Sequence, residues 1–261
     1  MQAPALVRIP IWREGRVALE HAALRRDPVF RGRSVVDGDG APVMLVPGFL
    51  AGDPSMATMA SWLKRMGYRP CRAEMRANVD CGERAVGRLI EALERQVDRH
   101  GRRVAIVGQS RGGGLARLLA VRRPELVSGI VTLGSPLINQ LAVHPLVRAQ
   151  VFGVGLLGTL GVPGLFSHGC LKGDCCEDAR RDAEAPFPAG VGFVSVYSRS
   201  DGIVDWRSCL DPAARHVEVS ASHIGMSGHA PTYRAIARAL PLFGTGARAA
   251  SGSGRRRAAA A

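Results

Sequence analysis

Long apolar runs are scarce in this 261-residue sequence, and their scarcity argues against a membrane-spanning chain. The most apolar window, residues 151–166, is shorter than the roughly 20 residues that a spanning helix needs, and Pro163 and five glycines interrupt it. The first sixteen residues lack the apolar core and the small-residue cleavage site of a secretory signal. We therefore expect a cytoplasmic chain, or a secreted one if a leader preceded these residues.

Patterns typical of nucleic-acid binding are missing too. The net charge is +13, but nearly all of the positive charge is arginine spread along the whole chain, and four of these arginines lie in the tail after residue 247. No recognition helix, zinc-finger spacing or basic strand interleaved with aromatic residues accompanies them. We expect solvated arginines and no nucleic-acid partner.

The cysteines fit neither a zinc spacing nor a C-x-x-C redox motif. We therefore expect no metal, no cofactor and no redox catalysis. Disulfides can form in an oxidising compartment, but the sequence does not reveal their pairing. The six residues are Cys71, Cys81, Cys170, Cys175, Cys176 and Cys209.

Strand-like and helix-like segments alternate along most of the chain. Short β-branched runs occur at 42–47, 68–72, 103–108, 128–134, 191–198 and 216–220, and helical periodicity occurs between most of them. This alternation predicts an α/β fold with a mostly parallel sheet of about six strands, helices on both faces and an inserted cap. We expect residues 1–40 to be an extension with a short helix over 12–26, residues 41–243 to be the domain, and residues 244–261 to be a disordered basic tail.

One serine lies where a predicted strand meets a predicted helix. Ser110 stands between Gly108 and Gly112 in the stretch VAIVGQSRGGGLARLLA. A tight strand-to-helix turn crowds the backbone, so the positions two before and two after the serine must lack side chains. The pattern predicts a nucleophile elbow with an exposed hydroxyl at the start of a helix.

A serine nucleophile needs a histidine base and an orienting acid, which in this kind of fold follow it in the chain. His223 directly follows the last predicted strand, in a loop of small residues, and His229 is the alternative. Asp201 comes three residues after the strand at 191–198, and Asp205 is the alternative acid. We therefore predict a triad of Ser110, Asp201 and His223.

The loop after the first predicted strand reads LVPGFLAGD. A Pro-Gly pair there would turn the backbone so that the N–H of Phe49 points into the site, opposite the N–H of Arg111. Two such donors form an oxyanion hole. The alternative is an ordinary strand-to-helix turn.

The motifs LVPGF, GQSRGG, VTLGSP, SDGIV and SHIGM occur in this order over residues 40–242. Together they resemble the bacterial lipase and esterase branch of the α/β-hydrolase superfamily. The resemblance implies a serine carboxylic-ester hydrolase in which Ser110, Asp201 and His223 match the triad and Phe49 and Arg111 match the oxyanion loop. Two departures stand out: many lipases have His-Gly where this chain has Pro47-Gly48, and no antiparallel strands are evident before residue 40.

Residues 136–188 interrupt the strand–helix rhythm where such a fold inserts its cap. The glycines and Pro163 in 151–166 disfavour a rigid helix, and so many apolar side chains should not stay exposed to water. We expect a mobile lid over an acyl pocket, with Leu50, Leu157 and Leu160 contacting substrate; the alternative is a fixed structural cap.

The function expected from these patterns is hydrolysis of small or lipid esters with an apolar acyl chain. Transient contact with a lipid interface is compatible with this function. Acyl transfer from the same acyl-enzyme and a binding protein with an idle triad are the alternatives. Acyl length, the alcohol and the oligomeric state do not follow from the sequence.

Overall fold

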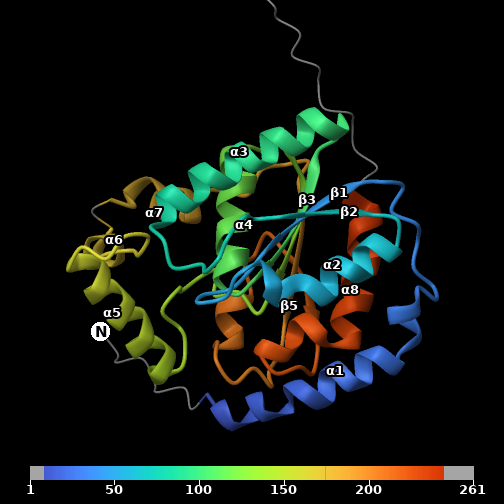
Figure 1. Ribbon diagram of the computed structural model, residues 1–261, viewed down its shortest axis with the longest axis horizontal. Helices are drawn as coiled ribbons and strands as arrows, with labels where there is room; N and C mark the ends of the chain where they lie inside the picture. Colours follow the sequence, from blue (N-terminus) through green and yellow to red (C-terminus); the bar gives the residue numbers. More distant parts are fainter. Residues whose placement is uncertain (1–8, 174, 244–261) are drawn as a thin grey trace, which may run out of the picture.

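A computed structural model describes residues 9–173 and 175–243. Within them the core is a six-stranded sheet in the order β2-β1-β3-β4-β5-β6, and every neighbouring pair is parallel (Figure 1). The fold class predicted from the sequence is therefore confirmed. The expected tail at 244–261 lies outside the described residues.

The central strands are buried on both faces, which explains their β-branched runs. They are β1 (Pro42–Val46), β3 (Val104–Gln109) and β4 (Val127–Leu133), followed by β5 (Gly192–Tyr197). The two edge strands, β2 (Arg69–Arg72) and β6 (Arg215–Glu218), are short and more exposed. No antiparallel strand precedes β1 in the part of the chain that the structure describes.

Helices cover both faces of the sheet (Figure 1). One apolar cluster joins the sheet to α1 (Val17–Arg26), α2 (Ala57–Arg65) and α8 (Ala230–Phe243). A second cluster on the other face includes α3 (Gly82–His100), α4 (Arg111–Arg122) and α7 (Glu177–Glu184). The short helices are η1 (Ile11–Arg16), η2 (Pro28–Arg31), η3 (Asp53–Met56), η4 (Trp206–Cys209) and η5 (Ile224–Gly228).

The strand order reverses direction between β1 and β3. The chain passes from β1 outward to β2, then returns to β3 and continues outward to β6. In open parallel sheets, ligands bind at the carboxyl ends of the strands beside such a reversal. The loops that follow β1 and β3 therefore meet at the position where this architecture places a site.

The inserted segment contains α5 (Pro145–Thr159) and α6 (His168–Lys172) before α7. The expectation that glycines prevent a helix in 151–166 is wrong for its first nine residues. The physical reason is close packing: a Cβ on Gly155 would lie 2.9 Å from the His168 ring, and one on Gly158 would overlap the carbonyl oxygen of Phe166. Contact with the following segment thus outweighs the low helix propensity of glycine.

α7 lies in the helix layer with α3 and α4, so the last part of the predicted lid belongs to the core of the domain. None of the helices in the described part of the chain is both long and apolar enough to cross a membrane.

Candidate active site

Ser110 lies in a strained turn between β3 and α4. Its backbone has φ 52° and ψ −121°, a left-handed conformation that residues with a side chain rarely adopt. A Cβ on Gly108 would overlap the carbonyl oxygen of Gly112, and a Cβ on Gly112 would overlap that of Val46. Both glycines are therefore required by the turn, as the elbow motif predicts.

The turn places Ser110 at the amino end of α4. The N–H of Ser110 donates to the carbonyl of Leu133 at the end of β4, at 2.8 Å. The first N–H groups of a helix have no partner within the helix and carry a partial positive charge. A negative charge that develops beside Ser110 would thus face the positive end of α4.

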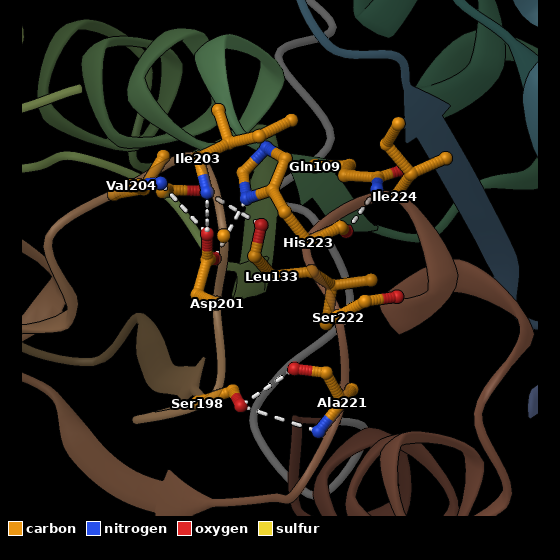
Figure 2. A network of polar contacts seen from close by, with 12 residues as sticks. Gln109, Leu133, Ser198, Asp201, Ile203, Val204, Ala221, Ser222, His223 and Ile224 are labelled. Carbon is orange, nitrogen blue, oxygen red and sulfur yellow. Dashed lines mark hydrogen bonds and ion pairs between the residues drawn. The ribbon is translucent and has the colours of Figure 1, made fainter. Parts of the chain in front are cut away.

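Asp201 and His223 form a buried pair on the loops that follow β5 and β6. The Nδ1 atom of His223 lies 2.7 Å from Oδ2 of Asp201. The other carboxylate oxygen accepts the backbone N–H groups of Ile203 at 2.8 Å and Val204 at 2.7 Å. Figure 2 shows these contacts converging on Asp201. The carboxylate is held by its own loop and in turn orients the imidazole.

A hydrogen bond and a close backbone approach connect the Asp201–His223 pair to the turn that carries Ser110. The side-chain amide of Gln109, the residue before Ser110, donates to the carbonyl of His223 at 3.1 Å. Gly134 directly follows Leu133, whose carbonyl accepts the N–H of Ser110. It also lies close to the Asp201–His223 pair: a Cβ on Gly134 would be 3.0 Å from Asp201 Oδ2 and 3.1 Å from His223 Nδ1. The structure therefore brings the three predicted triad positions to one edge of the sheet. Because Nδ1 faces Asp201, Nε2 is the nitrogen that remains for a hydroxyl.

The pKa of His223 is raised above its ordinary value. Burial alone would lower the pKa, but the charge of Asp201, its hydrogen bond and the charge of Glu14 favour the protonated imidazole and outweigh burial. The imidazolium that forms when a histidine takes a proton is thus stabilised in this environment.

The alternative residues have other contacts. Asp205 accepts the N–H of Arg207 at 3.1 Å and caps η4. Its contacts are therefore local to its own loop. His229 lies directly before α8, and its buried Nδ1 atom has no hydrogen-bond partner among the described residues. Neither residue is bonded to the Asp201–His223 pair.

Sequence reasoning missed two glutamates of the amino-terminal extension. The carboxylate of Glu14 accepts backbone N–H groups of His223 and Ile224, both at 2.8 Å, and of Gly202 at 2.9 Å. Glu20 accepts the N–H of Ser222 at 2.8 Å. The extension therefore holds the histidine loop and, through Gly202, the aspartate loop. No pattern in the sequence pairs these glutamates with loops near the carboxyl end of the chain.

The predicted oxyanion loop lies beside the serine. A Cβ on Gly48 would be 3.3 Å from the Cβ of Ser110, and Phe49 forms a parallel β-bridge with Asn78. Phe166 is buried with its ring centre 6.1 Å from that of Phe49 and 5.3 Å from the guanidinium carbon of Arg111. Phe166 therefore packs against both predicted oxyanion residues, a role that the sequence did not indicate.

The predicted substrate-contacting leucines are exposed. Leu50 is 51% exposed, Leu157 48% and Leu160 73%. The expectation that the apolar side chains of 151–166 are covered is therefore wrong for Leu157 and Leu160, because α5 and the residue that follows it leave apolar side chains facing solvent. Among the large apolar side chains of this segment, that of Phe166 is the buried one.

The chain is similar in structure to several lipolytic enzymes. A Bacillus licheniformis lipase in mature form matches with a TM-score of 0.59 and 15% identity over 81% of this chain and 95% of the lipase. A soluble variant of the monoglyceride lipase of Saccharomyces cerevisiae matches with a TM-score of 0.58 and 14% identity, over 82% of this chain and 89% of the lipase. A metagenome-derived lipolytic enzyme matches with a TM-score of 0.54 and 17% identity, over 80% of this chain and 95% of the enzyme.

The chain has the α/β-hydrolase fold. No family model matches its sequence, and no curated protein is significantly similar to it. At 14–17% identity to the solved structures, the likeness extends to the fold alone and leaves the activity of the chain to be argued from the site.

Proposed function

We propose that this α/β-hydrolase cleaves carboxylic esters with an apolar acyl chain, using Ser110, His223 and Asp201. The observation that carries the proposal is the buried 2.7 Å contact between His223 and Asp201, joined through Gln109 to a serine in a left-handed elbow turn. Ester hydrolysis by the structural neighbours agrees with it. These contacts support the roles of nucleophile, base and orienting acid that a serine triad requires.

In the proposed reaction, His223 Nε2 takes the proton of Ser110 Oγ as the oxygen attacks the ester carbonyl. The N–H groups of Phe49 and Arg111 donate to the oxyanion of the tetrahedral intermediate. The intermediate collapses to an acyl-serine, and the alcohol leaves with the proton from His223. Water then repeats the sequence and releases the acid. Asp201 stays ionised and stabilises the imidazolium in both halves.

The test is labelling with a fluorophosphonate, followed by assays with p-nitrophenyl esters. Ser110 should be modified, and Ser110→Ala should lose labelling together with at least about 1000-fold in kcat, because no other group supplies the nucleophile. Ser135→Ala, at a buried serine near the elbow, is the matched control and should keep the label. Added alcohol separates hydrolysis from acyl transfer through the products. Retention of more than about a hundredth of the activity in Ser110→Ala would refute the proposal.

A further inference from the structure

Four cysteines from distant parts of the sequence lie together beside the predicted oxyanion loop. Cys81 is the N-cap residue of α3, Cys170 lies in α6, and Cys175 and Cys176 precede α7. All four Sγ atoms lie within 4.8 Å of one another. We call these four residues the thiol cluster.

The distances in the thiol cluster suit one shared ion. Cys175 Sγ lies 3.0 Å from that of Cys170 and 3.8 Å from those of Cys81 and Cys176, and the Cys81–Cys176 distance is 3.5 Å. Four sulfurs bound tetrahedrally at about 2.3 Å are separated by about 3.8 Å. Of these four distances, that of the Cys170–Cys175 pair departs most from the tetrahedral value, and it must increase by less than about 1 Å. The two shortest distances, Cys170–Cys175 and Cys81–Cys176, join complementary pairs, but the Sγ atom of Cys175 also lies 3.8 Å from those of both Cys81 and Cys176, so the two pairs are in contact with each other.

The charges around the thiol cluster match the charge of a tetrathiolate site. Four thiolates around a divalent ion carry two negative charges, and Asp80, next to Cys81, adds a third. Arg84 and Arg88 contact the Asp80 carboxylate, each with a nitrogen at 2.6 Å. Arg111 donates to the backbone carbonyl of Asp80, next to Cys81. Three guanidinium groups therefore lie where they would balance the three negative charges of a loaded site.

Arg111 supplies an independent sign that a negative group is missing from its surroundings. Its guanidinium donates to the Asp80 carbonyl, yet its buried Nε has no hydrogen-bond partner within residues 9–173 and 175–243. A buried donor without a partner destabilises a fold unless something compensates it. A charged metal–thiolate group next to it would supply that compensation.

We propose that Cys81, Cys170, Cys175 and Cys176 bind one zinc ion as a structural tetrathiolate site. Binding replaces four S–H bonds by four Zn–S bonds and releases four protons, with no oxidation or reduction. Thiolate ligands favour Zn²⁺ among the tetrahedral divalent ions. The sequence indicated no metal because two ligands are adjacent to each other and Cys81 comes far earlier in the chain.

The site would fasten the inserted segment to the core of the domain. Cys81 belongs to the core helix α3, whereas the other three ligands flank the α6–α7 connection. Phe166, whose N–H already donates to the Val79 carbonyl at 2.8 Å, lies on the same side.

The test is metal analysis of the full chain, purified with a phosphine reductant and without chelators. We expect one zinc per chain. Cys176→Ser should lose most of the zinc, whereas Cys209→Ser, at a buried cysteine in a different apolar cluster, should keep it. After zinc is removed with a mercurial and the thiols are regenerated, Co²⁺ should produce the intense thiolate charge-transfer and visible bands of a tetrahedral site.

The wild-type measurements decide the matter even if Cys176→Ser does not fold. Absence of both zinc and the cobalt spectrum in the reduced chain would overturn the proposal. It would also be overturned by an intact mass lower by the four hydrogens of two disulfides, with no metal present. Equal zinc in Cys176→Ser and Cys209→Ser would overturn the assignment of the ligands.

Discussion

Asp201 and Asp205 lie on the same loop and differ in their contacts and burial. Asp201 is 4% exposed and bonded to His223, whereas Asp205 caps η4 and contacts Arg207. Asp201→Asn should lower kcat by about 10⁴-fold, because the amide no longer holds the imidazole in the required tautomer. Asp205→Asn should cost less than about tenfold, since it loses only a cap. Initial rates on one p-nitrophenyl ester compare the two, and a severe loss in Asp205→Asn alone would reverse the assignment.

In the proposed reaction, Glu14 would act on the rate through the pKa of His223, which its charge raises, without touching the substrate. The rate needs neutral His223, so it should rise with pH through the pKa of this residue, and that pKa lies above the ordinary value. Glu14→Gln keeps a carbonyl acceptor for the loop but removes a charge that raises the pKa.

The acid limb of the pH profile of kcat/KM should therefore move to lower pH in Glu14→Gln. Glu91→Gln, at an exposed position of α3, removes the same charge elsewhere and should leave the limb in place. An unmoved limb in Glu14→Gln would mean that Glu14 has a purely structural role.

At the scale of the element, α5 presents leucines to water instead of burying them. Because Leu157 is 48% exposed, Leu157→Asp should leave the melting temperature within the small range typical of surface changes. If α5 supplies apolar contact to a bound acyl chain, the same change should lower kcat/KM for long-chain esters by about tenfold or more. Acetate esters, which do not reach α5, should react at the normal rate.

Leu19→Asp is the matched control for α5. Leu19 is 73% exposed on α1, so its replacement should alter neither the melting temperature nor the chain-length preference. Equal losses on long and short esters in Leu157→Asp, together with a lower melting temperature, would show that α5 is a fixed structural cap.

At the scale of the whole molecule, a buried ion pair connects parts that are distant in the chain. Arg117 of α4 donates to Asp211 at 2.7 Å and to the carbonyls of Asp182 at 3.1 Å and Ala185 at 3.0 Å. It therefore joins the core helix, the end of the insertion and the β5–β6 connection. Removing one partner leaves the other charge buried and unpaired, which typically costs about 3–5 kcal/mol.

Arg117→Leu should accordingly lower the free energy of unfolding by about 3–5 kcal/mol in urea denaturation. Arg199→Leu, which breaks the exposed pair with Glu218, should cost less than about 1 kcal/mol. The double variant Arg117→Leu with Asp211→Leu should recover part of the loss, since no unpaired charge remains. A small effect in Arg117→Leu would mean that water reaches Asp211.

Much of the fold could be predicted because its signals are local. The β-branched runs of β1, β3 and β4 are typical of strands buried on both faces. The Gly108–Ser110–Gly112 pattern predicts a tight turn, because the backbone that a Cβ on Gly108 would meet, at Gly112, is nearby in the sequence. The chain order of Ser110, Asp201 and His223 then narrowed the site to a few residues.

The sequence by itself thus determined the alternation of strands and helices and the elbow, because these depend on residues within a few positions of one another. The tertiary structure alone decided which aspartate meets His223, that Glu14 holds the histidine loop, that α5 is helical and exposed, and that four thiols meet. Those contacts join distant segments, and their free energies depend on the path of the whole chain rather than on local spacing. The hydrogen bonds from the His223 loop to Glu14 are an example. Glu14 belongs to no recognisable motif, so the sequence could not pair it with that loop.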